Sequence, residues 1–272
     1  MLSTISLRLR MILQHIQSKL AFEDWLRYPQ FSTKMGLGRV AMLACILGTL
    51  WGIHFTLILF ICFCRLGIFQ QSLFEPDRMQ LVLQWSCYVL FLSTFHLLEF
   101  FITALYNPYV TSADSFLINH SIAYTTAALL SWTEFWVHFW CFPPFSTIYM
   151  MLLGVVMAIV AQCIRTLAMA TCAESFNHLI QVTKKDNHVL VTNGIYKIFR
   201  HPSYVGFYYW AVGTQLLLGN IICTVLFAIA AWMFFKRRIP YEEEALLQLF
   251  PEEYPDYVKS TYVGIPFLKT KS

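Results

Sequence analysis

The sequence predicts an all-α polytopic membrane protein with six to eight transmembrane helices. Hydrophobic residues make up 58% of the 272 residues and charged residues only 12%, whereas soluble domains carry roughly 25% charged residues. The mean hydropathy is +0.57, and several uncharged runs are long enough to cross a bilayer. Because no linker rich in Ser, Gly or Pro divides the chain, we expect a single membrane domain.

The first 39 residues are predicted to lie at the membrane surface. Arg8, Arg10 and Lys19 stand among Leu and Ile residues, so the segment lacks the sustained apolar core of a cleavable signal peptide. This mixture is typical of an amphipathic interfacial helix. We therefore expect an interfacial segment at 1–39, followed by transmembrane helices within 40–172.

Six apolar runs are predicted to form the transmembrane helices. A helix that crosses the whole membrane needs about 20 residues. The six runs are 40–64, 79–106, 116–139, 145–172, 204–218 and 221–235. The last two are short and are joined only by Gly219 and Asn220, which predicts a tight helical hairpin over 204–235. Gly48 and Gly52 could break the first run, and the N-terminal segment could enter the membrane, so eight helices are also possible.

The basic residues predict the orientation of these helices. Lys and Arg concentrate in 8–39, 184–200 and 236–271, and six helices would bring these three regions to one side of the membrane. The positive-inside rule assigns that side to the cytosol. We therefore expect the N-terminus, the polar segment 173–200 and the C-terminus to be cytosolic.

The remaining composition argues against two other classes of protein. The net charge is only +4, and no basic stripe with interleaved aromatic residues suggests binding to nucleic acid. All eight cysteines lie in or beside apolar runs without a CxxC pair, so we expect free thiols and no metal site.

The apolar sequence is interrupted by a polar block that consists of two parts, 187–206 and 237–244. Charges kept this close to hydrocarbon are costly, so they are a functional-site hypothesis by default. The short hairpin between the two parts would return both to one membrane face. We therefore predict a cytosolic pocket that is roofed by polar residues and floored by the membrane.

The first part of the block contains a predicted helix start. Proline is well tolerated in a first helical turn, so Pro202 predicts that His201, Ser203 and Tyr204 lie at the mouth of the fifth helix. Free backbone N–H groups and the positive end of the helix dipole would suit the carboxylate of a ligand there. The alternative is a helix cap with an interfacial histidine.

The rest of the block also has structural alternatives. Val189–Val191 and the Asn193-Gly194 turn could meet the edge of a flat ring, or they could form an ordinary loop. Arg237 and Arg238 could be a membrane stop. Pro240 is expected to open a new helix, where Glu242, Glu243 and Glu244 would suit the first turn.

Several blocks of the sequence resemble the isoprenylcysteine carboxyl methyltransferase family. They are Phe-Asn-His at 176–178, Leu-Val-Thr-Asn-Gly-Ile-Tyr at 190–196, Phe-Arg-His-Pro-Ser-Tyr-Val-Gly at 199–206, and Glu-Glu at 242–243. The resemblance is strongest over 160–268 and weaker around 114–121. The shorter Arg-His-Pro plus Glu-Glu pattern is shared with phospholipid N-methyltransferases, but the longer Asn-His and His-Pro-Ser-Tyr context favours the first family.

This resemblance implies methyl esterification of the C-terminal S-prenylcysteine carboxylate of prenylated proteins. The methyl donor would be S-adenosylmethionine, which leaves as S-adenosylhomocysteine. The partners would be small GTPases and other CaaX proteins together with membrane lipid, and the location the endoplasmic reticulum membrane. On this view 173–272 is the cofactor-binding and catalytic region, including the hairpin and a cytosolic C-terminal cap.

Site residues follow from the resemblance by matching position. The implied cofactor contacts are Gln181, His188, Val189, Leu190, Val191, Tyr196, His201, Pro202, Ser203, Tyr204 and Glu242. Arg238 is implied to bind the substrate, and Arg238 and Glu242 are the residues expected at the reacting groups. The run of acids leaves Glu242 and Glu243 as alternatives for the one that faces the cofactor.

Elementary chemistry agrees with this assignment. A carboxylate is ionised at neutral pH, with a reference pKa of about 3.5, so its methylation needs no general base. Arg238 could grip that carboxylate bidentately, while Glu242 pairs with the ammonium or ribose of the cofactor. His201 and the Ser203 backbone would lie near the cofactor carboxylate. Arg165 could be a second carboxylate anchor, or else a snorkelling or internally paired arginine.

Two other functions are possible. A lipid amine methyltransferase would use the same cofactor, but its nucleophile must lose a proton and would gain from a base more than from an arginine. A membrane transporter would concentrate polar groups near the middle of the membrane. The polar residues inside the apolar runs are expected to pair between helices instead; they are His96, Glu99, His120 and Glu134.

Overall fold

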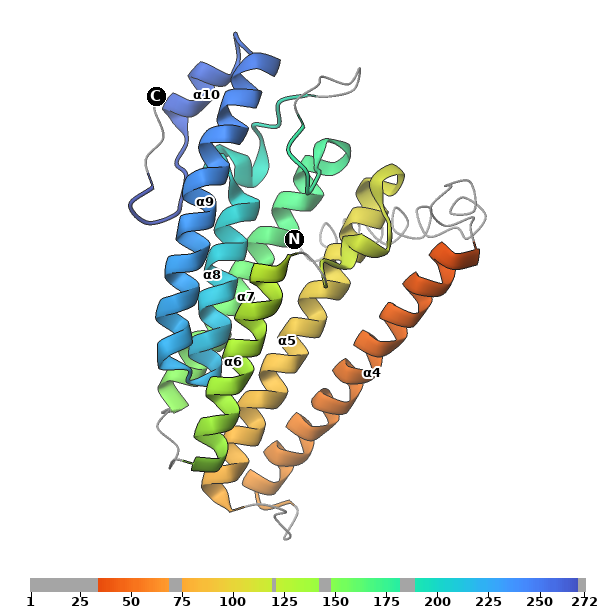
Figure 1. Cartoon of the computed structure of the whole chain (residues 1–272), viewed down its shortest axis with the longest axis vertical. Coiled ribbons are helices and arrows are strands. Elements are labelled where there is room, and N and C mark those ends of the chain that lie inside the picture. Colours follow the sequence, from red (N-terminus) through yellow and green to blue (C-terminus); the bar gives the residue numbers. More distant parts are fainter. Residues whose placement is uncertain (1–33, 69–74, 119–120, 142–147, 182–188, 269–272) are drawn as a thin grey trace, which may run out of the picture.

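The computed structural model describes residues 34–68, 75–118, 121–141, 148–181 and 189–268. Six long helices dominate it (Figure 1): α4 Lys34–Arg65, α5 Pro76–Tyr106, α6 Ile122–Cys141, α7 Ile148–Cys172, α8 Pro202–Leu218 and α9 Ile221–Leu249. Short elements are the 3-10 helices η1 Pro108–Val110, η2 Ala113–Phe116, η3 Ala173–Ser175 and η4 Gly194–Lys197, and helix α10 Tyr254–Ser260. Within these ranges no strand forms beyond one isolated bridge, so the all-α prediction is confirmed there.

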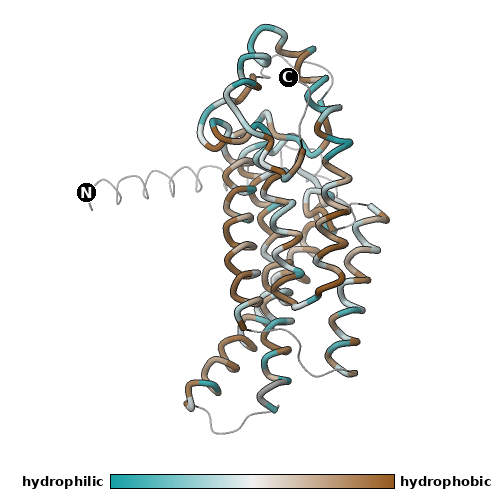
Figure 2. The backbone as a smooth tube through the Cα atoms, turned by 90° about the vertical axis from the view of Figure 1, so that its left-hand side faces the viewer, coloured by the Kyte–Doolittle hydropathy of each residue, from teal (hydrophilic) through white to brown (hydrophobic). Residues whose placement is uncertain are grey.

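Among the described residues, three stretches are long and apolar enough to cross a membrane by length and composition. They are Gly36–Arg65, Arg78–Tyr106 and Ile148–Ser175. Figure 2 shows hydrophobic colour along the shafts of the bundle and much of the hydrophilic colour at the end that carries the C-terminus. The predicted interfacial segment lies almost entirely in residues 1–33, outside the described part of the chain.

Helix α4 passes through both glycines that were possible break points. An added Cβ at Gly48 or Gly52 would meet nothing within 4 Å, so these positions face open space. Glycine costs a helix only about 1 kcal/mol relative to alanine, which the surrounding apolar run tolerates. The break that would have divided the first run does not occur.

The third apolar run becomes helical later than its composition suggests. Helix α6 begins at Ile122 instead of 116, and Phe116, the first residue of that run, is the last residue of η2. The Ser112 hydroxyl accepts from the Asp114 N–H, and the Ser115 hydroxyl accepts from the Ser112 N–H. Leu117 then adopts a left-handed conformation with φ of 56°, which ends η2.

The predicted hairpin is present as α8 and α9. Gly219 takes a positive φ of 76° at the end of α8, which glycine permits without a Cβ clash. Asn220 donates to the Ser131 carbonyl of α6 at 2.9 Å. The Glu134 carboxylate accepts from the Ile222 and Cys223 N–H groups at 2.9 and 2.7 Å, where the helix dipole favours an anion. Glu134 therefore pairs between helices, as expected.

The prediction that Pro240 opens a new helix is wrong. Helix α9 continues through Pro240 to Leu249. A proline inside a helix removes one backbone hydrogen bond, but the adjoining Ile239 is completely buried with Val205, Val263 and Ile265. This packing stabilises the continuous helix. Arg238, Glu242 and Glu243 consequently belong to one helix.

Helices α7 and α8 approach each other closely at glycines. A Cβ on Gly206 would lie 2.8 Å from the Ala161 carbonyl oxygen and 2.7 Å from the Arg165 Cβ. A Cβ on Gly154 would lie 2.3 Å from the Leu217 nitrogen. Small residues permit this backbone contact between membrane helices, and it brings Arg165 directly beside the start of α8.

Candidate active site

One cavity of about 340 Å³ extends from the polar segments around 176–181 and 189–191 down between α5, α6, α8 and α9. On α8 its lining runs from Pro202 to Gln215, which corresponds to about 20 Å at 1.5 Å per residue. We call its two parts the polar mouth and the apolar arm. The apolar arm is lined chiefly by Leu92, Phe95, Tyr124, Ala127, Ala128, Phe207, Trp210, Ala211, Phe227, Ala230, Ala231, Phe234 and Phe235.

The polar mouth collects the cofactor-binding and substrate-binding residues that the resemblance implies. Each of them that the structure describes lines the cavity: Gln181, Val189, Leu190, Val191, Tyr196, His201, Pro202, Ser203, Tyr204, Arg238 and Glu242. His188 lies outside the described residues. Residues 189–192 have no regular secondary structure, and the turn after them uses a positive φ of 58° at Gly194. Residues distant in the sequence therefore meet at one site.

The start of α8 forms one wall of the mouth. His201 is the N-cap residue and Pro202 occupies the first turn, as predicted, and the His201 side chain makes no capping hydrogen bond. His201 is 4% exposed, and its ring stacks on that of Tyr204 with centroids 5.5 Å apart and planes 6° apart. The positive end of the α8 dipole consequently faces the mouth.

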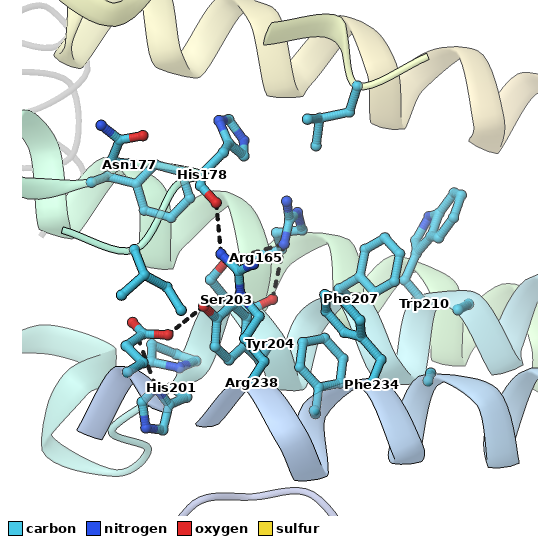
Figure 3. A pocket seen from close by; sticks show the side chains of 18 of the residues that line it. Arg165, Asn177, His178, His201, Ser203, Tyr204, Phe207, Trp210, Phe234 and Arg238 are labelled. Carbon is cyan, nitrogen blue, oxygen red and sulfur yellow. Dashed lines mark hydrogen bonds and ion pairs between the residues drawn. The ribbon is translucent and has the colours of Figure 1, made fainter. Parts of the chain in front are cut away.

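Arg238 and Glu242 meet around the hydroxyl of Tyr204; Figure 3 labels Tyr204 and Arg238 at this place. Arg238 Nε donates to that hydroxyl at 2.8 Å, and the hydroxyl donates to Glu242 Oε2. Arg238 Nη2 donates to the His178 carbonyl at 2.6 Å, while Nη1 makes no hydrogen bond within the described ranges. Because α9 is continuous, Arg238 and Glu242 are four residues apart on one helix face. The guanidinium is thus held at the mouth with donors left for a ligand.

The structure distinguishes Glu242 from Glu243. Glu243 is 8% exposed and does not line the cavity. Its Oε1 accepts from Arg200 Nε at 2.6 Å and from His201 Nε2 at 3.1 Å. Arg200 also donates to the Thr261 carbonyl at 2.9 Å. Glu242 therefore faces the cavity, whereas Glu243 ties α9 to the segment before α8 and to the C-terminal region.

A second charged cluster in the cavity wall was not predicted as a unit. Arg165 donates to both carboxylate oxygens of Glu99, and its Nη1 donates to the Ser203 carbonyl and hydroxyl at 3.1 and 3.0 Å. His178 Nε2 lies 2.9 Å from Glu99 Oε2. Arg165 is thus an internally paired arginine, the second of its two predicted alternatives. Charges inside apolar runs were the available signal, but the sequence did not identify their partners.

Asn107, at the end of α5, orients the segment that carries His178. Its side-chain amide donates to the carbonyls of Glu174 and Phe176, both at 2.9 Å. An amide with two hydrogens suits this pair of acceptors. The sequence did not single out Asn107, because one asparagine after a helix is typical of an ordinary helix end.

Tyr196 forms another part of the mouth and stays protonated. Its hydroxyl donates to the Ala168 carbonyl at 3.4 Å, and its own carbonyl accepts from the Tyr257 hydroxyl at 2.8 Å. Burial, followed by the nearby Cys172, raises the pKa of Tyr196 well above its ordinary value. Its phenol therefore remains a neutral hydrogen-bonding group across the physiological range of pH.

Comparison with known proteins identifies the family. A sequence model of the isoprenylcysteine carboxyl methyltransferase family matches residues 152–248, which hold most of this site. The chain is 37% identical over 253 residues to protein-S-isoprenylcysteine O-methyltransferase of Saccharomyces cerevisiae, covering 90% of this chain and 98% of the relative. The chain belongs to the isoprenylcysteine carboxyl methyltransferase family.

Other members of the isoprenylcysteine carboxyl methyltransferase family match less of their own length. The Homo sapiens enzyme is 41% identical over 235 residues, covering 85% of this chain and 75% of the relative. For the Xenopus laevis enzyme, 46% identical over 183 residues, the match covers 67% of this chain and less than two thirds, 64%, of the relative.

A solved structure aligns with most of the length of the chain. It is described as the eukaryotic intramembrane Ras methyltransferase ICMT, and it aligns with a TM-score of 0.78 and 33% sequence identity. The alignment covers 98% of this chain and 88% of that one. The protein therefore has the helical fold of a membrane-embedded methyltransferase.

Proposed function

We propose that this protein transfers a methyl group from S-adenosylmethionine to the C-terminal carboxylate of S-prenylcysteine. The observation that carries the proposal is the continuity of the cavity, in which a long apolar arm opens into a mouth containing Arg238 and Glu242. A prenylcysteine has this same division, with a hydrocarbon chain at one end and a carboxylate at the other. The names of the relatives agree with this substrate.

S-adenosylmethionine fits the residues of the mouth. The uncapped start of α8 at Ser203 suits its carboxylate, and the Glu242 carboxylate suits its ammonium group or a ribose hydroxyl. The backbone of 189–191, which is free of regular secondary structure, offers hydrogen-bonding groups to its flat base. When bound, this cofactor supplies a methyl group activated by a sulfonium. His188 belongs to the same proposed set by its position in the sequence.

Arg238 would bind and orient the substrate carboxylate through its remaining N–H donors. Tyr204 and the His178 carbonyl fix the guanidinium, so it is preorganised before the substrate arrives. The carboxylate is already ionised at neutral pH, and no proton has to be removed by the protein. Alignment of two reactants can contribute about 7–11 kcal/mol to such a step.

The charge balance of the mouth favours this reaction over methylation of an amine. In the part of the mouth that the structure describes, the arginines are matched by carboxylates in three pairs: Arg165 with Glu99, Arg200 with Glu243, and Arg238 with Glu242 through Tyr204. A carboxylate and a sulfonium lose their opposite charges when the methyl group is transferred. A neutral, partly buried site weakens the solvation of both charges and so assists their loss.

We assign the protein to the endoplasmic reticulum membrane, as a multi-pass protein with α4–α9 as its six spans. The polar mouth would face the cytosol, in agreement with the basic regions 184–200 and 236–271. Small GTPases and other CaaX proteins would present their prenylated C-termini there. The prenyl chain would lie in the apolar arm among lipid-facing helices, which explains why the enzyme is embedded in a membrane.

The role of Arg238 is tested by substituting it in the full chain reconstituted in lipid nanodiscs. Hydrogen bonds to charged groups contribute about 1.5–3 kcal/mol, so Arg238→Ala should raise the KM for S-farnesylcysteine about tenfold to a hundredfold. The affinity for S-adenosylmethionine should change much less. Arg237→Ala is the matched control because Arg237 is exposed and does not line the cavity. Methylation by Arg238→Ala at the wild-type rate would remove Arg238 from the mechanism.

A further inference from the structure

We propose that a hydrogen-bonded floor at the deep end of the apolar arm sets the longest prenyl chain that the protein accepts. The polar floor consists of Tyr88, Thr214 and Gln215, which line the end of the cavity farthest from the mouth. This inference rests on the proposed function and extends it from the class of substrate to the length of its chain.

The polar floor is buried, and its polar groups are hydrogen-bonded to one another or to the helices around them. Thr214 and Gln215 are each 1% exposed. Gln215 Oε1 accepts from the Ser131 hydroxyl at 2.8 Å and from Asn220 Nδ2 at 3.1 Å. Gln215 Nε2 donates to the Thr214 hydroxyl at 3.4 Å. The Tyr88 hydroxyl accepts from Trp132 Nε1 at 2.9 Å.

These hydrogen bonds make the floor resistant to a hydrocarbon chain. A tail that displaced Gln215 would leave the Ser131 hydroxyl without its acceptor and would remove one of the acceptors of Asn220, and an alkyl group offers no replacement. The same network joins α6 to the α8–α9 turn, which Glu134 also ties to α6. Moving the floor would therefore require moving three helices together.

The wall of the apolar arm above the polar floor is apolar. It is made of alanines and aromatic rings, including Ala128 of α6, Ala211 of α8 and Phe227 of α9. Figure 3 shows Phe207, Trp210 and Phe234 together on one side of the labelled polar groups. This lining accommodates hydrocarbon, so the space ends where the chemistry of the lining changes.

The position of the floor gives the arm a defined length. Ser203 at the mouth and Gln215 at the floor are separated by twelve positions on α8, or about 18 Å along the helix. Because the carboxylate is fixed at Arg238, each additional isoprene unit must extend toward the floor. The floor thus acts as a stop that discriminates among chains longer than the arm.

The test alters the depth of the arm and measures chain-length preference in the full chain in nanodiscs. Ala128→Phe would fill space near the floor, and Phe227→Ala would enlarge it. Leu129→Phe is the matched control, because Leu129 is the neighbouring residue of α6, is 55% exposed and does not line the cavity. The values compared are kcat/KM for S-geranyl-, S-farnesyl- and S-geranylgeranyl-cysteine.

One misfitted methylene in an apolar pocket changes kcat/KM by about ten- to two-hundredfold. Ala128→Phe should therefore reduce the geranylgeranyl-to-geranyl ratio of kcat/KM at least about tenfold, and Phe227→Ala should raise it, while Leu129→Phe leaves it unchanged. If Ala128→Phe does not fold, the opposite shift in Phe227→Ala carries the test. An unchanged ratio in folded variants overturns the floor proposal, whereas a wild-type protein that methylates none of the three acceptors overturns the proposed function itself.

Discussion

Glu242 and Glu243 show how one position along a helix changes the role of an acidic residue. Neighbouring helical residues point in directions about 100° apart, whereas residues four apart share a face. Glu242 thus faces the cavity with Arg238, while Glu243 faces Arg200 and His201. The sequence alone left these two acids as alternatives, because their order is informative only when the helix is known to pass through Pro240.

Substitution of Glu243 is predicted to lower stability, whereas substitution of Glu242 is predicted to lower the affinity for the cofactor. Glu243→Ala leaves Arg200 buried without its carboxylate, which costs about 3–5 kcal/mol for a buried pair, so the thermal unfolding midpoint should fall clearly. Glu242→Gln should lower the affinity for S-adenosylmethionine with little change in that midpoint. Thermal unfolding and calorimetric titration of both variants check this, and reversed behaviour would contradict the assignment of Glu242 to the cofactor.

Most of the polar mouth could be predicted from the sequence at the level of single residues. Pro202 predicted the start of α8, and Gly194 predicted the turn before it, because each has a narrow range of backbone conformations. The cluster of Glu99, Arg165 and His178 could not be assembled in this way. Its members come from α5, α7 and the segment after η3, and only tertiary packing determines which charges meet.

At the scale of the helices, the continuity of α9 is the feature that composition alone did not predict. Proline and a run of acids after a basic cluster are a strong local signal for a new helix. Burial of Ile239 and Phe235 against α8 and the C-terminal segment overrides that signal. By contrast, the turn at Gly219 was predictable because the two apolar runs leave only two residues to reverse the chain.

The contact between α7 and α8 is predicted to be intolerant of a single methyl group. Gly206→Ala would press a Cβ against the backbone of α7, and overpacking of this kind costs about 1–3 kcal/mol. It should lower both the unfolding midpoint and methyl transfer, because Arg165 would move away from Ser203.

Gly52→Ala is the control for that substitution. Gly52 lies in α4 with nothing within 4 Å of an added Cβ. Alanine there should leave activity unchanged and stabilise the helix by about 0.5–1 kcal/mol. Equal loss of activity in the two variants would show that the glycines have no specific packing role.

At the scale of the whole molecule, the protein combines two environments that its proposed substrate would require together. The aromatic and alanine-lined arm lies between the helices, and balanced ion pairs surround the mouth at its end. The apolar composition predicted the first environment and the split polar block predicted the second. Their connection in one cavity depends on the helical hairpin, the continuous α9 and the close packing of α7 on α8.

The identity of the methyl acceptor is the central claim, and a competition assay tests it most directly. The full chain in nanodiscs containing phosphatidylethanolamine is given S-adenosylmethionine with a labelled methyl group and S-farnesylcysteine. We predict that the label appears in a base-labile methyl ester of the prenylcysteine. Label that appears only in a base-stable methylated lipid amine, or no transfer by folded protein that binds S-adenosylmethionine, would contradict the account.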